Sequence, residues 1–214
     1  MVVLFAAAAR AHDARGGAPA PGNAEPDVRL DAEARRGLDL LTRTRIRLPA
    51  YAGNRLNCTS CHIDGGRRPG ALPWTDVART YPQYRAREGR VVTLEDRVDQ
   101  CFLRSLNGKA PPHDSPAIRD ILAYFAWLSK SAPAEARTKA PGIAAQFVAG
   151  PPDARAGEVL YRSRCVRCHA SDGSGLSDPD DDPYVDVPPL WGKESFNIGA
   201  GMARLHTAER FIQR

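Results

Sequence analysis

Hydrophobic positions recur at helical spacing in five segments of the chain, and polar or Gly/Pro-rich stretches separate them. We predict helices over the following ranges: 31–43, 90–106, 116–130, 157–164 and 202–214. Asp114 or Ser115 can cap the third helix, with Pro116 in its first turn. No apolar run is long enough to cross a membrane, so we expect no membrane span.

Two of these predictions rest on particular apolar side chains. In 90–106, Val91 and five later apolar residues share one broad face. In 202–214, Leu205, Phe211 and Ile212 are expected to make apolar contacts. Both segments are therefore expected to pack through one side.

Two pentapeptides, 58–62 and 165–169, follow the pattern Cys-x-x-Cys-His. This is the attachment signature of c-type haem, in which two thiols bind the vinyl groups and the histidine ligates iron. A zinc site or a thioredoxin-like pair could also use paired cysteines, but neither explains a histidine after both pairs. We therefore predict two covalently bound haem c groups. The residues expected to hold them are Cys58, Cys61, Cys165 and Cys168, with His62 and His169 on the iron.

The fifth cysteine, Cys101, has no partner left for a disulfide. It lies 39 residues after His62, which resembles the distance in a small cytochrome c to the residue on the opposite haem face. No methionine occurs between residues 1 and 202, so the candidates for that position are Cys101, His113 or nothing. Arg97 would favour a thiolate, as would Arg104. The alternative is a small buried apolar residue.

Charge and the remaining segments add less specific expectations. Residues 31–130 hold 17 Lys or Arg against 11 Asp or Glu, which suits an anionic substrate or is a solvated basic face. The six aspartates of 172–186 predict a solvated loop, with a calcium site as the alternative. Residues 2–11 read as the tail of a secretory signal, and covalent haem attachment implies a periplasmic location. Nothing predicts a nucleic-acid partner.

The fold class predicted is all-α, with two cytochrome c-type domains, each wrapped around a covalently bound haem, the second incomplete. The predicted divisions are a signal remnant and disordered leader (1–30), a first domain (31–130), a linker (131–152) and a second domain truncated at its C-terminus (153–214).

Several blocks together resemble the dihaem c-type cytochrome thiosulfate dehydrogenase family. They are Asn57-Cys58-Thr59-Ser60-Cys61-His62, Tyr81-Pro82-Gln83-Tyr84-Arg85, the run from Leu94 to Lys109, Asp114-Ser115-Pro116, Pro188-Pro189-Leu190-Trp191-Gly192 and the run from Ser195 to Met202. The resemblance implies oxidation of two thiosulfates to tetrathionate, or the reverse. Electrons would pass from the first haem to the second, and then to an external acceptor such as a small cytochrome c.

The resemblance also implies roles for individual residues. Cys101 would be the second iron ligand of the catalytic haem, in domain 31–130, and could also carry a sulfane–sulfonate adduct that a second thiosulfate attacks. The second haem would take a methionine just past residue 214, for which Met202, Lys193 and His206 are the nearest substitutes. The predicted substrate-binding residues are Arg85, Arg87, Arg104 and Ser105.

Two other functions stay open. One is a sulfur-carrier cytochrome, similar to an L-cysteine S-thiosulfotransferase, which would couple thiosulfate to a cysteine of a partner protein. The other is an electron-transfer dihaem cytochrome without a substrate, in which Cys101 would be inert.

Overall fold

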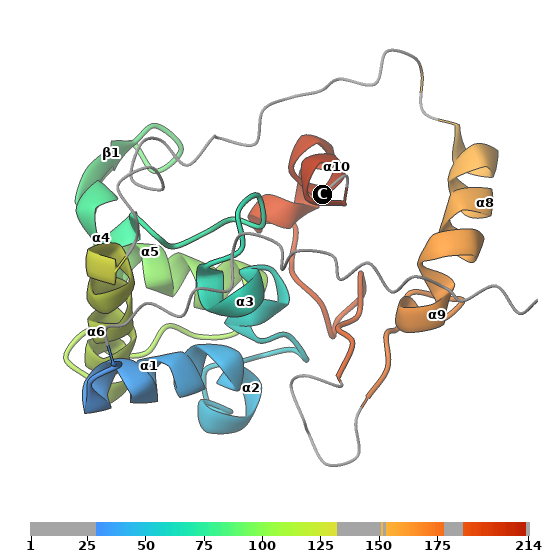
Figure 1. Cartoon of the computed structure of the whole chain (residues 1–214). Helices are drawn as coiled ribbons and strands as arrows, with labels where there is room; N and C mark the ends of the chain where they lie inside the picture. The colour runs from blue at the N-terminus through green and yellow to red at the C-terminus, as the bar shows by residue number, and fades with distance from the viewer. Residues whose placement is uncertain (1–28, 132–150, 152, 178–185, 213–214) are drawn as a thin grey trace, which may run out of the picture.

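The computed structural model describes residues 29–131, 151, 153–177 and 186–212, and the described chain is mostly helical (Figure 1). The leader predicted over 1–30 and the linker over 131–152 lie almost wholly outside these residues, as do four of the six aspartates of 172–186. Within the described ranges, no helix is long and apolar enough to span a membrane.

Helices α1 (Ala32–Thr42) and α6 (Pro116–Ser131) pack against each other in the first part of the chain, residues 29–131. The Asp31 carboxylate caps α1 by accepting the Ala34 N–H at 2.7 Å, and the Ser115 hydroxyl accepts the Ile118 N–H at 3.3 Å. Both predicted helices are thus confirmed. Their backbones approach so closely that a Cβ on Gly37 would collide with the Asp120 carbonyl oxygen.

The helix predicted over 90–106 is wrong at its beginning. Residues Gln83–Arg85 (β1) and Arg90–Val92 (β2) pair as a two-stranded antiparallel hairpin, so the chain is not entirely α-helical. Val91 lies on strand β2, not on a helix face, and 58% of its surface is exposed. Helix α5 (Leu94–Gln100) begins only after Thr93, whose hydroxyl accepts the Asp96 N–H at 3.2 Å.

A π-helical turn, η2 (Cys101–Ser105), continues α5 without a break. Its Leu106 N–H donates to the Cys101 carbonyl at 2.9 Å, five residues back. Single π-turns of this kind often occur at functional sites, because the extra residue re-aims the side chains around it.

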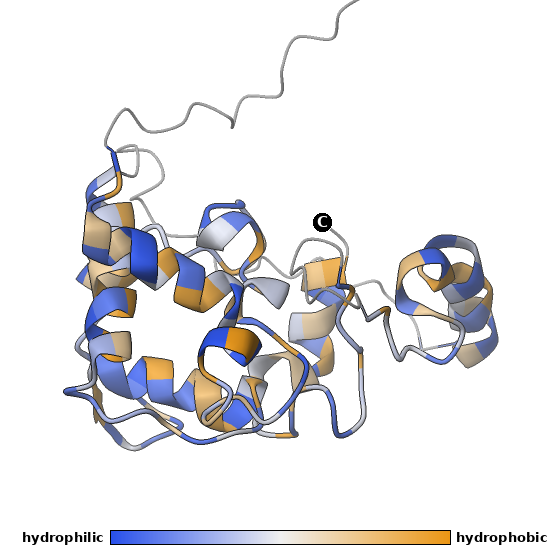
Figure 2. Cartoon of the chain, turned by 90° about the horizontal axis from the view of Figure 1, so that it is seen from below, coloured by the Kyte–Doolittle hydropathy of each residue, from blue (hydrophilic) through white to orange (hydrophobic). Residues whose placement is uncertain are grey.

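The remaining elements of the first part are short. They are α2 (Thr44–Arg47), η1 (Cys58–Ser60), α3 (Ile63–Gly66) and α4 (Val77–Thr80). The core lies between α1, α5, η2 and α6, and its largest fully buried side chains include Leu41, Phe102, Ile121 and Tyr124. Apolar and hydrophilic residues alternate along these helices, as expected for amphipathic elements (Figure 2).

The second part of the chain consists of the described residues from 151 onward. It contains α8 (Ala154–Arg164), α9 (Val166–His169), η3 (Gly201–Ala203) and α10 (Leu205–Ile212). Helix α8 begins three residues before the predicted start, because the Asp153 carboxylate caps it. The expected apolar contacts of α10 are wrong for Leu205 and Ile212, which are 83% and 74% exposed. In both views α10 lies between the first part and the pair α8–α9 (Figures 1 and 2).

Asp186 joins the two parts. Its carboxylate is only 3% exposed and lies 3.2 Å from Arg55 and 3.6 Å from Arg45. The Arg55 guanidinium also donates to the carbonyls of Ser174 and Leu176. The prediction of a solvated loop is therefore wrong for Asp186, because two arginines of the first part surround it.

Replacing Gly37 with Ala should destabilise the protein by about 1–3 kcal/mol, because the added Cβ collides with the backbone of α6. Gly157 is a matched control, since it lies in α8 and a Cβ added there would meet nothing within 4 Å. Gly157→Ala should leave stability unchanged or raise it by about 0.5–1 kcal/mol through helix propensity. Thermal denaturation followed by circular dichroism tests both, and equal stability of the two variants would contradict the close contact of α1 and α6.

Candidate functional site

The first Cys-x-x-Cys-His motif forms one wall of a cavity. The Cys58 N–H donates to the Thr44 hydroxyl at 3.1 Å, and the same hydroxyl lies 3.3 Å from Cys58 Sγ. Burial raises the pKa of the Cys58 and Cys61 thiols to about 12, so both sulfurs are uncharged at neutral pH. Thr44, which is fully buried, thus holds the start of the motif in place.

His62 is oriented by its neighbours. Its Nδ1 lies 2.5 Å from the Leu72 carbonyl oxygen, and its ring stacks on Trp74 with centroids 4.4 Å apart. Burial lowers the pKa of His62 to about 4, which keeps the imidazole neutral. Because the Leu72 carbonyl accepts the Nδ1–H, Nε2 is the ring nitrogen that could ligate a metal, as in many histidine ligands.

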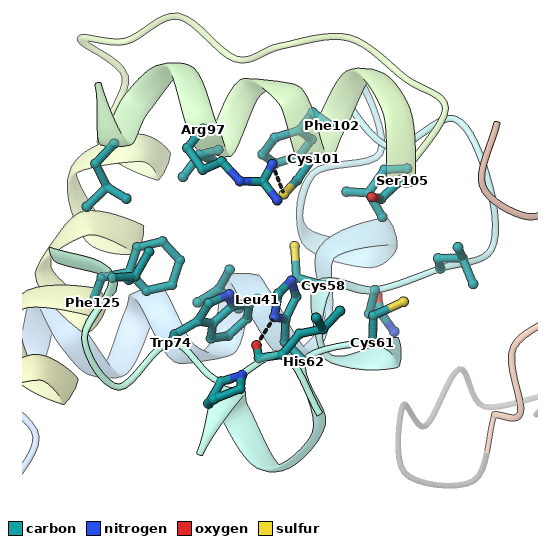
Figure 3. Close-up of a pocket in the computed structure, with 18 of the residues that line it drawn as sticks. Leu41, Cys58, Cys61, His62, Trp74, Arg97, Cys101, Phe102, Ser105 and Phe125 are labelled. Carbon is teal, nitrogen blue, oxygen red and sulfur yellow. Dashed lines mark hydrogen bonds between the residues drawn. The ribbon is translucent and has the colours of Figure 1, made fainter. Parts of the chain in front are cut away.

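Arg97, Cys101 and Ser105 form the opposite wall of the cavity. They are spaced by four residues along α5 and η2, and Figure 3 shows them facing the side where Cys58 and His62 lie. The Arg97 Nη1 donates to Cys101 Sγ at 3.4 Å. A half-buried guanidinium thus lies within hydrogen-bond distance of this sulfur.

The raised pKa of Arg97 supports its pairing with Cys101. The charge of Cys101 is the largest cause that raises the pKa of Arg97, and the Tyr81 hydroxyl adds to it. Burial acts in the opposite direction but is weaker. Arg97 therefore stays charged next to Cys101.

The cavity fits a haem of c type. Its volume is about 280 Å³, near the lower end for ligand pockets, and apolar side chains dominate its lining. They include Leu41, Leu56, Trp74, Val98, Phe102, Leu106 and Phe125. The two cysteines and the neutral histidine on one wall are the residues by which a c-type haem is attached and ligated, and Cys101 faces them from the opposite wall.

The structure brings Ser105 to the cavity but not the other predicted substrate residues. Arg104 is three residues after Cys101 and forms an ion pair with Glu88 at 3.1 Å. Arg87 donates to the Gly199 carbonyl at 3.1 Å, and Arg85 is exposed on β1. None of these three arginines is among the residues that line the cavity.

Glu88 links these arginines to the cavity indirectly. Burial opposes its ionisation, but the hydrogen bond and charge of Arg104, with the charge of Arg85, outweigh burial and lower the pKa of Glu88. Glu88 also acts electrostatically on Arg97. Arg85, Arg97 and Arg104 thus share one carboxylate.

His113, a candidate for the position opposite His62, lies elsewhere. Its Nε2 contacts Asp99 Oδ2 at 2.6 Å, and its side chain is 49% exposed. His113 does not line the cavity, whereas Cys101 does.

The second Cys-x-x-Cys-His motif repeats the histidine contact of the first. His169 Nδ1 lies 3.2 Å from the Pro188 carbonyl oxygen, so the beginning of the block 188–192 lies beside His169. The surroundings are more open, since Cys168 is exposed and Trp191 is 57% exposed. Met202 is half-buried on η3, next to α10.

Sequence reasoning gave Arg97 no place in the substrate site and missed the supporting roles of Thr44 and Leu72. The signal for Arg97 was its spacing, because positions four residues apart share a helix face. Thr44 and Leu72 carried no comparable signal, since their contacts depend on the folded chain.

Residues 50–134 match the family described as SoxA/TsdA, cytochrome c domain. The chain is 46% identical over 192 residues to a thiosulfate dehydrogenase of Allochromatium vinosum, covering 88% of this chain and 70% of that protein. It is 39% identical over 188 residues to a thiosulfate dehydrogenase of Psychrobacter arcticus, covering 88% of this chain and 57% of the relative.

Among solved structures, the chain is similar to the thiosulfate dehydrogenase TsdBA from Marichromatium purpuratum in its as-isolated form. The TM-score is 0.75 at 32% sequence identity, and the match covers 88% of this chain and 42% of the other. The chain therefore spans less than half of that protein's length.

The contact of His113 with Asp99 should produce a small pH dependence of stability. Asp99 raises the pKa of His113, so the stabilisation is fully present below pH 6.5 and is lost as the pH rises through the raised pKa. The pair is exposed, so we expect less than about 1 kcal/mol. Chemical denaturation of wild type and His113→Gln across this range tests it, and Asp99→Asn should behave like His113→Gln. A pH dependence that survives both substitutions would contradict the assignment.

Proposed function

Because the chain belongs to the thiosulfate dehydrogenase family, we propose that it is a periplasmic c-type cytochrome that joins two thiosulfates into tetrathionate, or catalyses the reverse reaction. The observation that carries the proposal is the placement of Cys101 across the cavity from His62, with Arg97 3.4 Å from its sulfur. A sulfur beside a fixed cation suits both iron ligation and chemistry on an anionic sulfur compound.

Two haems would be held by residues of this chain. Cys58, Cys61 and His62 would hold the first, with Cys101 on its other side. When bound, each haem supplies a site that accepts one electron, which matches the two electrons released when one S–S bond forms. The residues proposed for the second haem are Cys165, Cys168 and His169, with Met202 as the candidate on the opposite side.

The substrate is a dianion, so its binding requires fixed positive charge in a low-dielectric site. Arg97 and the Ser105 hydroxyl would bind the sulfonate end of thiosulfate, because both line the cavity next to Cys101. Arginine suits this role since its planar guanidinium can donate two parallel hydrogen bonds to an oxyanion. Arg85, Arg87 and Arg104 do not line the cavity. Arg85 and Arg104 would act on it indirectly, because they lower the pKa of Glu88.

Cys101 is also the residue that could react covalently. Its thiolate and the sulfane sulfur of one thiosulfate would form a disulfide bond, with the release of two electrons to the external acceptor. The sulfane sulfur of a second thiosulfate would then attack that bond, form tetrathionate and regenerate the thiolate. Arg97 would stabilise the thiolate at the start and end of this sequence.

A sulfur-carrier cytochrome is the second candidate, because the family matched by residues 50–134 is described by both SoxA and TsdA. Such a protein would transfer thiosulfate to a cysteine of a partner protein. The two candidates differ in one product, since only the dehydrogenase forms tetrathionate from free thiosulfate.

The test uses purified haem-loaded protein, thiosulfate and an artificial one-electron acceptor. We expect one tetrathionate for each two acceptors reduced, and we expect Cys101→Gly to abolish the reaction. The same variant should lose the low-spin thiolate-type spectrum of ferric haem. Absence of tetrathionate with an intact thiolate spectrum would exclude the dehydrogenase and favour the sulfur carrier, whereas an unchanged spectrum in Cys101→Gly would exclude Cys101 as ligand.

Arg97→Ala should lower the catalytic efficiency for thiosulfate by about ten- to hundredfold, because a charged hydrogen bond to a partly buried anion is worth about 1.5–3 kcal/mol. Arg85→Ala is the comparison, since Arg85 is exposed on β1. Arg87→Ala and Arg104→Ala complete the series. An arginine whose loss changes the efficiency by less than about twofold, a difference of about 0.4 kcal/mol, is a surface charge and not a substrate ligand.

A further inference from the structure

The last carbonyl groups of the helix that carries Cys101 all accept hydrogen bonds, the final three from distant segments of the chain. The carbonyls of Cys101 and Phe102 accept the N–H groups of Leu106 and Gly108. The next three carbonyls receive donors from other segments: Leu103 and Arg104 from Asn197, and Ser105 from Asn54. Helix ends leave such carbonyls without intrahelical partners, so these contacts decide how the last turn is shaped.

Asn197 makes two of these three contacts. Its side-chain Nδ2 donates to the Leu103 carbonyl at 2.8 Å, and its backbone N–H donates to the Arg104 carbonyl at 3.0 Å. Nδ2 also donates to Asn107 Oδ1 at 3.2 Å, so both of its hydrogens are used. The Asn197 Oδ1 accepts the Gly199 N–H at 2.9 Å, which fixes the orientation of the amide.

The segment that presents Asn197 is anchored at the second motif. The Pro188 carbonyl contacts His169, and the hydroxyl of the fully buried Ser195 donates to the Pro189 carbonyl at 2.9 Å. Asn54 donates to the Ser195 carbonyl at 2.8 Å with the same side-chain nitrogen that contacts the Ser105 carbonyl. Asn197, which contacts the turn that carries Cys101, therefore follows Pro188, which contacts His169, by only nine positions.

We propose that Asn197 is a positioning residue for Cys101: its side chain holds the π-turn Cys101–Ser105 in the geometry that directs the sulfur toward the iron of the first haem. The inference rests on the proposed function, because it takes Cys101 as the ligand of that iron. A π-turn is rare compared with continued α-helix, and the donors of Asn197 stabilise it by satisfying carbonyls that the turn leaves open. The segment 188–197, which is anchored at the second Cys-x-x-Cys-His motif, thus controls how Cys101 ligates the iron of the first haem.

Asn197→Asp is the sharpest test. The substitution keeps the side-chain shape and the oxygen that accepts the Gly199 N–H, but it replaces the nitrogen that donates to Leu103 and Asn107. In haem-loaded Asn197→Asp, the low-spin thiolate-type spectrum of the ferric protein should weaken, with a high-spin component in its place. Amide exchange over residues 98–108 should accelerate by about tenfold, as expected when one or two hydrogen bonds are lost.

Ile198→Ala is the matched control, because Ile198 is the next residue and is 90% exposed. It should match wild type in both measurements. If Asn197→Asp does not accumulate as haem-loaded protein, Asn107→Gly removes one of the same bonds and suits the positive φ of 49° at that position. A smaller change in the same direction is then expected.

The spectrum and the exchange rates are read without thiosulfate, so they test the role of Asn197 even if the proposed reaction is not observed. If Cys101→Gly changes the spectrum but Asn197→Asp, or Asn107→Gly in its place, leaves both measurements at the wild-type values, Asn197 has no positioning role. If Cys101→Gly itself leaves the spectrum unchanged, the proposed ligation fails, and the positioning role of Asn197 fails with it.

Discussion

The contact between Arg97 and Cys101 places a cation and a sulfur inside a cavity whose other walls are mostly apolar. A charge in such surroundings is costly unless an opposite charge or a hydrogen bond compensates it. The Cys101 sulfur, the Tyr81 hydroxyl and the charge of Glu88 all act on Arg97, so an apolar residue in place of Cys101 would remove the largest of the influences that compensate this cation. The rest of the first part, from the pairing of α1 with α6 to the orientation of His62, builds the walls that face this pair.

The parts of the fold that depend on neighbouring residues were predictable from the sequence. The caps at Asp31 and Ser115 act within three residues, so they fix the beginnings of α1 and α6 by themselves. The β1–β2 hairpin was missed because Val91 fits the helical stripe equally well in sequence. The π-turn was also missed, since its carbonyls are satisfied by Asn197, more than ninety residues away.

The same distinction applies to the candidate site. The two Cys-x-x-Cys-His motifs follow from spacing, because the attachment of a flat ring requires short, fixed separations. Cys101 was selected differently, since it is the cysteine left without a partner and no methionine competes for its place. The arginines do not follow from spacing, because a guanidinium reaches far and its final partner is decided by the fold. Glu88 holds Arg104 and the Gly199 carbonyl holds Arg87, while the equally basic Arg97 faces Cys101.

Asp186 lies almost wholly out of water, between Arg45 and Arg55. Mobile ions screen exposed charges at distances beyond about 8 Å at physiological salt, but they hardly reach a buried pair. A change in ionic strength would therefore act on the exposed basic groups of the surface more than on the contacts of Asp186. In the proposed function the rate of electron transfer would depend on the separation of the two motifs, and this buried contact, which helps to hold that separation, would respond little to the salt around the molecule.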